Sequence, residues 1–416
     1  MELMPGYKLS DVGVIPDDWD AKPLGEIGDS LIGLTYRPSE VRKYGTLVLR
    51  SSNVQNGVLC FDDNVFVDAD IPERIMVRPG DILVCVRNGS RDLIGKSALI
   101  DERAIGMTFG AFMAVFRSEH GKLLHHVFQS GVFKKQINEH LGATINQITN
   151  RSLNSFKVPL PSTNEERTEI ANALSNVDAL LTTLDLVISK KRDLKQAAMQ
   201  KLLTGEIRLP GFSGEWGVKQ IGEFTDCTAG GTPSTLISSY WGGEIPWMSS
   251  GELHLKRVEE VEGRITELGL NSSSTKIVPR NCVLVGLAGQ GKTRGTVAIN
   301  LIALCTNQSI AAIFPNPSFI SEYLYYNLDA RYDELRELST GDGGRGGLNL
   351  KIIKAITIPF PSLQEQKAIA AVFADMDAEL SALESRRYKA KELKQAMMQE
   401  LLTGKTRLIA KEESHV

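Results

Sequence analysis

Residues 158–205 read VPLPSTNEERTEIANALSNVDALLTTLDLVISKKRDLKQAAMQKLLTG, and residues 358–404 repeat this stretch as IPFPSLQEQKAIAAVFADMDAELSALESRRYKAKELKQAMMQELLTG. The two copies align at an offset of 200 residues, or of 199 after one gap. Solenoid units are much shorter, roughly 20–50 residues. The repeat therefore indicates that one large half of the chain was duplicated.

Both copies have the apolar spacing of a long helix. Apolar residues recur seven apart, at Ile170, Val177 and Leu184 in the first copy and at Ile369, Met376 and Leu383 in the second. This spacing forms a seam along a helix and favours coiled-coil pairing. At 1.5 Å per residue, a helix of about 40 residues is roughly 60 Å long. Because the two helices share one pattern and one length, we predict that they pair antiparallel; the alternative is that each lies on its own domain.

The ends of the predicted helices carry stop and start signals. Ser162 and Ser362 are the predicted N-caps, and Glu165 and Glu365 follow three residues later as in a capping box. The exits LLTG end in Gly205 and Gly404, and glycine suits the left-handed position that closes a helix.

The regions outside the helices also match each other. Trp19 aligns with Trp216, and Pro79 aligns with Pro279. β-Branched content and flanking turns predict short strands in both regions, at 47–50, 81–86, 96–100 and 112–116 and again at 283–288, 296–300 and 309–314. One helix is predicted after the strands of each region, at 122–141 and at 318–338.

We therefore predict an α+β fold. Two mixed α/β domains are separated by two long helices that pair as an antiparallel coiled coil, and the duplication gives the chain a pseudo-twofold plan. The predicted boundaries are 1–157 for the first domain, 158–205 for the central helix, 206–357 for the second domain, 358–404 for the C-terminal helix and 405–416 for a tail.

Composition narrows the class of protein. The chain has 416 residues, 42% of them hydrophobic, with no apolar run near 18 residues and no secretory signal pattern at the N-terminus. Five widely spaced cysteines without a C-x-x-C motif favour a reducing, cytoplasmic location. Of the six histidines only His125 and His126 are adjacent. We expect these two to be surface or core residues, and we predict no metal site.

The charge balance limits how the chain could hold nucleic acid. The net charge is −3, and the first helical copy carries six basic and six acidic residues. A protein that holds DNA by charge alone has a basic excess. Any such role must rest on local patches or be shared with partner subunits.

One motif resembles a phosphate-binding loop. Residues 286–293 read GLAGQGKT and fit G-x-x-x-x-G-K-T. A phosphate-binding loop needs a following helix and an acidic partner at a strand end. Here RGTVAIN follows, which predicts a turn and then a strand. We interpret this stretch as a glycine-rich hairpin whose Gln290, Lys292 and Arg294 project outward.

The sequence as a whole resembles the specificity subunits of type I restriction–modification enzymes. The resemblance rests on GGTPS at 230–234, YWGGEIPWMSSGEL at 240–253, LAGQGKTRG at 287–295, LVLRSSNVQNG at 47–57, the P-x-P-S starts and LKQAxMQxLLTG, which occurs twice. It implies two target-recognition domains, each recognising one half of a bipartite DNA target. The helices would set the spacer length between the half-sites and dock two methyltransferase subunits, to which restriction motor subunits can be added.

The resemblance also implies that this chain is a non-catalytic subunit. S-adenosylmethionine, ATP and Mg would act in the partner subunits, with no cofactor in this chain. The residues agree, because neither an Asn/Asp-Pro-Pro-aromatic motif nor a glycine-rich cofactor loop after a strand occurs. The residues with which the helices would dock partners are the seam positions Ile170, Val177, Leu184, Ile369, Met376 and Leu383.

Candidate DNA contacts follow from side-chain chemistry and from the loops that align between the halves. Arginine recognises guanine, and asparagine or glutamine recognises adenine, in the major groove. The predicted contacts in the first domain are Arg50, Ser51, Asn53, Arg87, Asn88, Arg91, Asn146, Gln147 and Arg151. Those in the second domain are Ser249, Ser250, Gln290, Lys292, Arg294, Arg345 and Asn349.

Two alternatives belong to other functional classes. One is an ATPase that uses 286–293 as a phosphate-binding loop. The other is a structural coiled-coil scaffold that makes no contact with DNA and selects no sequence.

Overall fold

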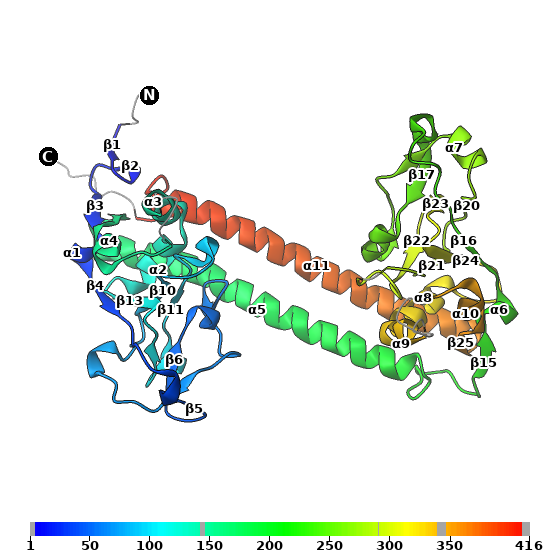
Figure 1. Ribbon diagram of the computed structural model, residues 1–416, viewed down its shortest axis with the longest axis horizontal. Helices are drawn as coiled ribbons and strands as arrows, with labels where there is room; N and C mark the ends of the chain where they lie inside the picture. The colour runs from blue at the N-terminus through cyan, green and yellow to red at the C-terminus, as the bar shows by residue number, and fades with distance from the viewer. Residues whose placement is uncertain (1–4, 142–145, 290, 339–346, 410–416) are drawn as a thin grey trace. The chain divides into compact units, whose positions relative to one another are not determined.

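The computed structural model describes residues 5–141, 146–289, 291–338 and 347–409 (Figure 1). The chain divides into two compact units. The first contains the chain up to Leu184 and from Arg386 onward, and the second is Asp185–Ser385. Each unit therefore contains one mixed α/β region together with part of both long helices, which confirms the predicted fold class.

The long helices are α5 (Asn164–Leu202) and α11 (Leu363–Leu401), with 39 residues each. They run antiparallel within unit 2, because Lys191 of α5 pairs with Glu379 of α11 at 2.7 Å and Lys195, further along α5, pairs with the earlier Asp377. In unit 1, Lys394 of α11 pairs with Asp178 of α5 at 2.6 Å.

The helices begin later than the repeat does. The Pro-x-Pro segments form the short strands β14 (Lys157–Leu160) and β25 (Thr357–Phe360), each in a two-stranded antiparallel sheet. Proline lacks a backbone N–H, and edge strands tolerate it for that reason.

The predicted N-caps are right in one copy and wrong by one residue in the other. Ser362 Oγ accepts from the Glu365 N–H at 3.2 Å. In the first copy Thr163, not Ser162, accepts from the Glu166 N–H at 3.3 Å, because the one-residue gap between the copies lies here. The exits match the prediction, since Gly205 and Gly404 have φ angles of 76° and 69°.

Unit 1 is built on two four-stranded sheets. One has the order β11-β10-β13-β4 and is antiparallel throughout; the other has the order β12-β6-β9-β5. The strands of the two sheets are β4 (Asp29–Ile32), β5 (Val41–Arg42), β6 (Thr46–Leu49), β9 (Phe66–Val67), β10 (Ile82–Cys85), β11 (Ser97–Leu99), β12 (Thr108–Phe109) and β13 (Met113–Arg117). The two-stranded sheets pair β1 (Tyr7–Ser10) with β2 (Gly13–Pro16), β3 (Asp20–Pro23) with β14, and β7 (Val54–Gln55) with β8 (Val58–Leu59). The helices are α1 (Leu24–Ile27), α2 (Gly121–Gln129), α3 (Gly131–His140) and α4 (Asn150–Ser155).

Unit 2 repeats this plan in order. Its sheets have the orders β16-β24-β21-β22-β18 and β19-β17-β23-β20. Their strands are β16 (Cys227–Ala229), β17 (Trp241–Met248), β18 (Arg257–Val258), β19 (Arg264–Ile265), β20 (Ile277–Val278), β21 (Val283–Gly286), β22 (Val297–Asn300), β23 (Leu304–Thr306) and β24 (Ile310–Ile313). Strand β15 (Gly217–Gln220) pairs with β25, and the helices are α6 (Ile221–Phe224), α7 (Glu267–Asn271), α8 (Ser321–Asp329), α9 (Tyr332–Glu337) and α10 (Leu350–Ala355).

The strands predicted from the sequence all occur, within one or two residues at each end. The two predicted single helices are each broken into two. In unit 1 the break falls at Ser130, which has an extended ψ of 165° and whose hydroxyl donates to the Val127 carbonyl. The Ser130 N–H donates to the same carbonyl at 3.0 Å, so both bonds close the helix at this turn.

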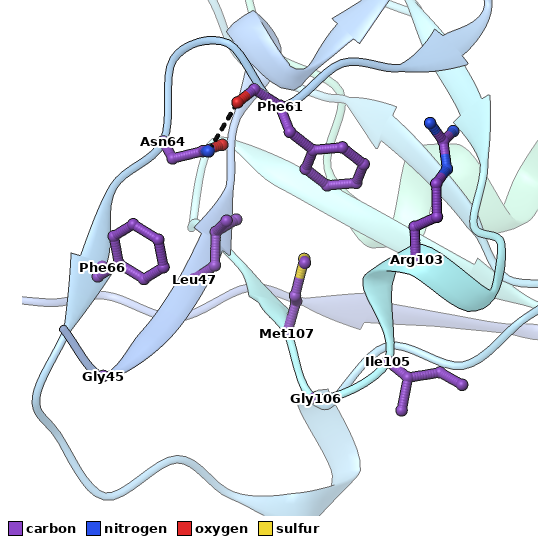
Figure 2. Close-up of a pocket in the computed structure, with 9 residues that line it drawn as sticks. All are labelled: Gly45, Leu47, Phe61, Asn64, Phe66, Arg103, Ile105, Gly106 and Met107. Carbon is purple, nitrogen blue, oxygen red and sulfur yellow. Dashed lines mark hydrogen bonds between the residues drawn. The ribbon is translucent and has the colours of Figure 1, made fainter.

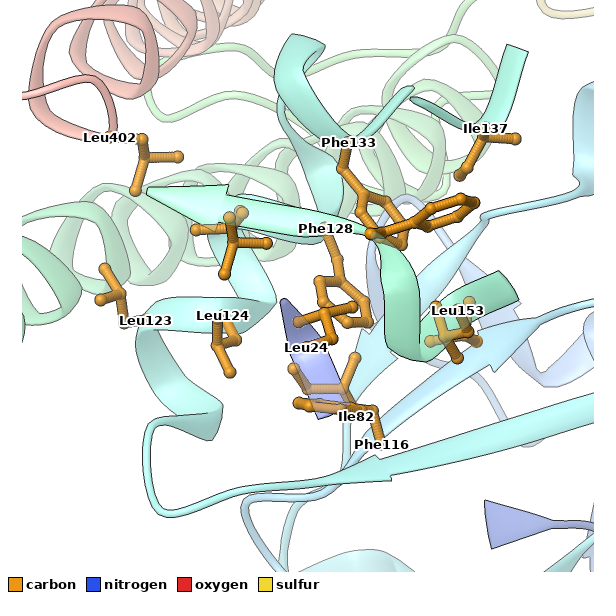
Figure 3. Packing of buried hydrophobic residues seen from close by; sticks show 14 of the residues in the cluster. Leu24, Ile82, Phe116, Leu123, Leu124, Phe128, Phe133, Ile137, Leu153 and Leu402 are labelled. Atoms are coloured by element: carbon orange, nitrogen blue, oxygen red, sulfur yellow. The ribbon is translucent and has the colours of Figure 1, made fainter. Parts of the chain in front are cut away.

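A hydrophobic cluster in unit 1 joins the globular region to both long helices. Side chains from the sheet and from α2–α4, such as Phe116 and Phe128, pack with Ile170 and Leu174 of α5. Leu402, just after α11, enters the same cluster (Figure 3). In unit 2 the corresponding cluster includes Leu202, at the end of α5, and Ile369 and Phe373 of α11.

Each unit contains the same buried polar group, a glutamate held by a tryptophan and an arginine. In unit 1 the Trp19 indole N–H donates to Glu166 at 3.1 Å, and Arg407 donates to both oxygens of that carboxylate. In unit 2 Trp216 and Arg208 hold Glu365 in the same way. The sequence predicted that Glu365 is the reciprocal member of a capping box. This prediction is wrong, because the Glu365 carboxylate bonds to Trp216 and Arg208. We call these two groups the Trp–Glu–Arg clasps.

Arg407→Ala should loosen the first clasp. Glu166 is only 1% exposed, and removing one partner of a buried ion pair strands the other charge. We expect a loss of about 2–4 kcal/mol in local stability, measured by hydrogen exchange at the first turns of α5. Arg103→Ala is the control, because Arg103 and Asp101 pair on the surface and such a pair contributes about 1 kcal/mol or less. Equal effects of the two substitutions would contradict a structural role for the clasp.

Candidate nucleic-acid interface

Two of the loops predicted to contact DNA in unit 1 lie side by side. The loop after β10 packs against the residues that precede α4, because the Ile148 N–H donates to the Val86 carbonyl at 2.8 Å. Arg87 and Gln147 form an isolated β-bridge at the same place. The fold thus brings together segments about 60 residues apart in sequence.

The third predicted loop joins them through side chains. Asn88 Nδ2 donates to the Ser51 hydroxyl at 3.3 Å, and Lys96 Nζ donates to the Ser51 carbonyl at 3.4 Å. Ser51 begins the short 3-10 helix η2 (Ser51–Asn53). The three predicted stretches of the first domain therefore form one surface.

This surface exposes cationic and amide groups. Its exposed members are Arg87, Arg91, Asn146, Gln147 and Arg151. The Arg87 guanidinium lies 5.1 Å from the centre of the Phe112 ring, and that ring is 58% exposed. Arg50 forms a 2.7 Å ion pair with Asp63, in which both side chains are partly exposed.

Asn53 differs from the other predicted contacts. Its side chain is fully buried; it accepts from the Arg50 N–H at 2.9 Å and donates to the Cys60 and Asp63 carbonyls. These bonds hold the loop that carries Arg50 and Ser51. The prediction that Asn53 contacts DNA is therefore corrected: its amide shapes the loop and is not presented to a base.

The second unit repeats the central contact. The Leu348 N–H donates to the Leu287 carbonyl at 3.0 Å, which joins the loop after β21 to the residues before α10. Lys292 is exposed, and its carbonyl accepts from the Tyr332 hydroxyl at 3.0 Å. Arg294 is half-buried. The predicted contacts Gln290 and Arg345 lie outside the described residues.

The remaining predicted contacts of unit 2 have local structural partners. Ser249 bonds to Glu252 at the start of the 3-10 helix η7 (Ser250–Leu255), and the Ser250 hydroxyl accepts from Asn307 at 3.4 Å. Asn349 is exposed and caps α10 by accepting from the Ile352 N–H at 3.0 Å. These side chains position their loops, and the exposed Asn349 also faces solvent.

The resemblance to a phosphate-binding loop does not extend to the structure. Strand β21 and strand β22 pair antiparallel, and the Gly295 N–H donates to the Gly286 carbonyl at 2.9 Å to close the connection. A hairpin closed in this way has no helix N-terminus facing the position of a phosphate. The predicted hairpin is therefore present, and the ATPase alternative has no structural support.

The buried thiols near these loops are not poised for nucleophilic chemistry. Burial raises the pKa of the Cys85 thiol beside Asn88, and it raises the pKa of Cys282 to about 12. Both groups therefore stay protonated at neutral pH, and a thiol is a weak nucleophile in that form.

Three of the six predicted docking residues on the helices are buried and not available to a partner. Ile170, Leu184 and Ile369 are less than 5% exposed, and Ile170 and Ile369 pack in the cores of their own units. Val177, Met376 and Leu383 are half-buried. The prediction that they dock a partner is corrected for the three buried residues. The exposed apolar side chains on these helices include Leu186, Leu194, Tyr388 and Leu393, at 48–68% exposure.

A separate pocket of about 400 Å³ lies beside β6 and β12 in unit 1 (Figure 2). Phe61, Phe66 and Met107 line it, with Arg103 at its edge. Arg103 is already bound to Asp101 through both carboxylate oxygens. None of the predicted DNA contacts lines this pocket, so we treat it as distinct from the interface.

Sequence reasoning missed two residues of the unit 1 surface. Phe112 lies in the apolar run FMAVF, where nothing distinguishes an outward ring from the core residues that follow. Lys96 was visible as a cation in the aligned loop, but only the fold shows its bond to Ser51. Among the described residues, no helix combines the length and apolar content needed to cross a membrane.

Comparison with known proteins gives a consistent result. The sequence model of the family described as "Type I restriction modification DNA specificity domain" matches residues 16–190 and 213–393. The putative type I restriction enzyme MjaX specificity subunit of Methanocaldococcus jannaschii is 25% identical over 97% of each chain. The MjaIX specificity subunit of the same organism is 35% identical, over 39% of this chain and 38% of that protein. The crystal structure of a type I restriction–modification S subunit from M. genitalium shares the fold, with a TM-score of 0.61, 17% identity and coverage of 96% of this chain and 99% of that one.

The different roles of Asn53 and Asn88 can be separated by substitution. Asn53→Ala leaves the Arg50 N–H and two carbonyls without partners, so we expect about 2–3 kcal/mol of lost local stability. Asn88→Ala is the matched control, with an expected change within about 0.5 kcal/mol. Hydrogen exchange at β6 measures both. A loss of similar size in the two variants would assign Asn88 a structural role as well.

Proposed function

We propose that this chain, which belongs to the type I restriction–modification DNA specificity family, is the non-catalytic subunit that selects the DNA target. Each unit recognises one half of a bipartite sequence. The observation that carries this proposal is the duplicated interface. In each unit, the loop after the central strand is joined to the loop before a short helix by one backbone hydrogen bond, from Ile148 to Val86 or from Leu348 to Leu287.

The side chains on these loops have the chemistry of base and phosphate recognition. Arginine and lysine bind phosphates and guanine, and amides pair with adenine. Arg87, Asn88 and Gln147 meet at one place in unit 1, and Lys292 is exposed on the corresponding loop of unit 2. The exposed Phe112 ring beneath Arg87 adds an apolar surface suited to a thymine methyl group or a sugar.

The charge of the chain supports a shared grip on DNA. With a net charge of −3, this chain lacks the basic excess that drives non-specific binding. We infer that double-stranded DNA is held jointly with two methyltransferase subunits. S-adenosylmethionine would act in those partners, and ATP and Mg in any restriction motor subunits that join the assembly. The cytoplasm is where a system of this kind would meet its DNA.

The helices support a spacing and docking role. The division that we propose keeps 1–157 and 206–357 as recognition domains, 158–205 and 358–404 as spacer helices, and 405–416 as a tail. Leu186 of α5 in unit 2 and Tyr388 of α11 in unit 1 are exposed apolar side chains on the long helices. We propose the exposed faces of these helices, each within its own unit, in place of the buried seam residues, as the positions at which a methyltransferase docks.

Arg87→Ala combined with Asn88→Ala should relax recognition of one half-site only. Each lost base contact costs about 1–3 kcal/mol of specific binding. Mapping the methylated motif in cells that carry the partner subunits measures the change. Lys292→Ala is the matched variant and should affect the other half-site. If the first variant relaxed both half-sites equally, the assignment of one half-site to each unit would be wrong.

The spacer role can be tested by lengthening both helices together. Seven residues inserted after Leu184 and after Ser385 preserve the faces of both helices and add about 10 Å to each. That length corresponds to about three base pairs, so the methylated motif should acquire a longer spacer. The same seven residues inserted after Leu408, beyond both helices, should leave the spacer unchanged. An unchanged spacer in the first variant would rule out the helices as the measuring element.

A further inference from the structure

Two buried histidines in unit 1 lie against the first long helix. His125 and His126 of α2 are 7% and 1% exposed, and their ring centres are 5.1 Å apart. Asp178 of α5 completes the group. One ligand atom from each of the three residues lies within 4.8 Å of the others. Adjacent histidines carry no metal-binding spacing in the sequence, and only the packing of α2 on α5 adds the carboxylate.

The histidine rings are only partly hydrogen-bonded. His126 Nε2 lies 3.2 Å from the Ser175 hydroxyl, and His125 Nε2 lies 3.0 Å from the Gln129 amide nitrogen. The Nδ1 atoms of both rings are buried without a hydrogen-bond partner among the described residues. His126 Nδ1 is 3.7 Å from Asp178 Oδ2, which is beyond hydrogen-bonding distance. Buried polar atoms without partners are uncommon and point to a missing ligand.

Both rings are enclosed by the packing of α2 on α5, at 7% and 1% exposure. A neutral imidazole offers one ring nitrogen as a metal ligand.

The duplicated half shows the same position with a different pair of residues, one of which is fully hydrogen-bonded. In unit 2, Tyr325 and Tyr326 of α8 stand where the histidines stand, and Asp377 of α11 takes the place of Asp178. The Tyr326 hydroxyl donates to Asp377 at 2.8 Å and accepts from Arg257 at 2.9 Å. The lysine–aspartate pair is common to both units, as Lys394 with Asp178 and Lys195 with Asp377. The two junctions thus share the lysine–aspartate pair but differ at the paired ring residues of α2 and α8 and at the neighbours Gln129 and Arg257.

We propose that His125, His126 and Asp178 bind one divalent transition-metal ion of the zinc class. Two neutral imidazoles and a carboxylate form a ligand set that suits zinc, with bonds of about 2.0–2.2 Å. A separation of up to 4.8 Å between ligand atoms requires each to move inward by less than about 1 Å to reach such bonds. The Asp178 side chain is 30% exposed, so an ion can enter past it and keep a water molecule as a further ligand.

The Lys394 ammonium would compete with a metal ion for the Asp178 carboxylate. Its ammonium bonds to Asp178 Oδ1 at 2.6 Å and to Gln129 Oε1 at 3.0 Å. A bound cation would repel this ammonium and draw Asp178 toward the histidines. If Nδ1 of His125 is the ligand atom, the Gln129 amide turns over to accept from Nε2–H, and this releases its bond to Lys394.

The consequence of binding is mechanical. The histidines belong to α2, which packs on the sheet that contains β10 and β11, whereas Asp178 belongs to α5. A metal would therefore fix α2 to α5 within unit 1. This role goes beyond target selection and does not depend on it.

The full-length chain can be titrated with Co²⁺, and Zn²⁺ can then be added to displace it. We expect one ion per chain, visible absorption bands of a nitrogen- and oxygen-ligated cobalt centre, and a higher unfolding temperature with metal bound. The double variant H125Y/H126Y copies the pair that already packs in unit 2, so it should fold. It should lose at least tenfold in cobalt affinity.

Two further variants separate a metal site from a merely structural histidine pair. Asp178→Asn should weaken cobalt binding at least tenfold, whereas Asp377→Asn, the matched position in unit 2, should leave it unchanged. Lys394→Met removes the competing ammonium and should tighten binding about tenfold. The proposal would be overturned by the absence of saturable one-to-one binding, by equal effects of Asp178→Asn and Asp377→Asn, or by a Lys394→Met variant that binds no tighter.

Discussion

The architecture depends on a buried carboxylate at the start of each long helix. Glu166 and Glu365 are 1% and 2% exposed, and a buried charge is tolerated only when it is paired and hydrogen-bonded. Each receives an indole N–H from the beginning of a globular region and a guanidinium from the segment just after the other long helix. The first clasp therefore connects three parts of the chain that are distant in sequence, and the second connects the start of α11 to the segment that follows α5. Because the arginine follows the left-handed glycine of an LLTG exit, the end of one helix is held beside the beginning of the other.

Rigid junctions of this kind allow the loops that face solvent to differ. The two units share the sheet that carries the loops and the backbone bond that joins them, but the side chains on the loops are different. Arg87 and Gln147 in unit 1 have no counterpart of the same type at Ala288 and Gly347. A scaffold held by buried interactions and a surface that varies is the arrangement expected of a protein that must recognise two different half-sites.

The same comparison of units shows where duplication left an unsatisfied position. Tyr326 completes its hydrogen bonds with Asp377 and Arg257, whereas both histidines of unit 1 keep a buried ring nitrogen without a partner. Packing is preserved in both cases, since the tyrosine and histidine pairs are equally enclosed. The two positions therefore differ in the hydrogen bonding of their ring residues, at the point where α2 or α8 packs on a long helix.

The sequence by itself determined the repeat, the two helices of equal length, the glycine exits, the main strands and the membership of the family. These features are encoded locally, by apolar periodicity and by residues with special backbone preferences, and the duplication supplied an internal check. The alignment of the two halves also located the loops of the candidate interface. Only the tertiary structure decided which side chains on them are exposed. Asn53 was predicted to contact DNA because an amide can pair with adenine, but its side chain is buried and donates to the carbonyls of Cys60 and Asp63. Ile170 and Ile369 are buried in the cores of their own units. The clasps and the histidine–aspartate group were likewise invisible, since each contains residues far apart in sequence. Glu166 lies 241 residues from Arg407, and Glu365 lies 149 residues from Trp216. No local pattern states which distant side chain a buried group will meet.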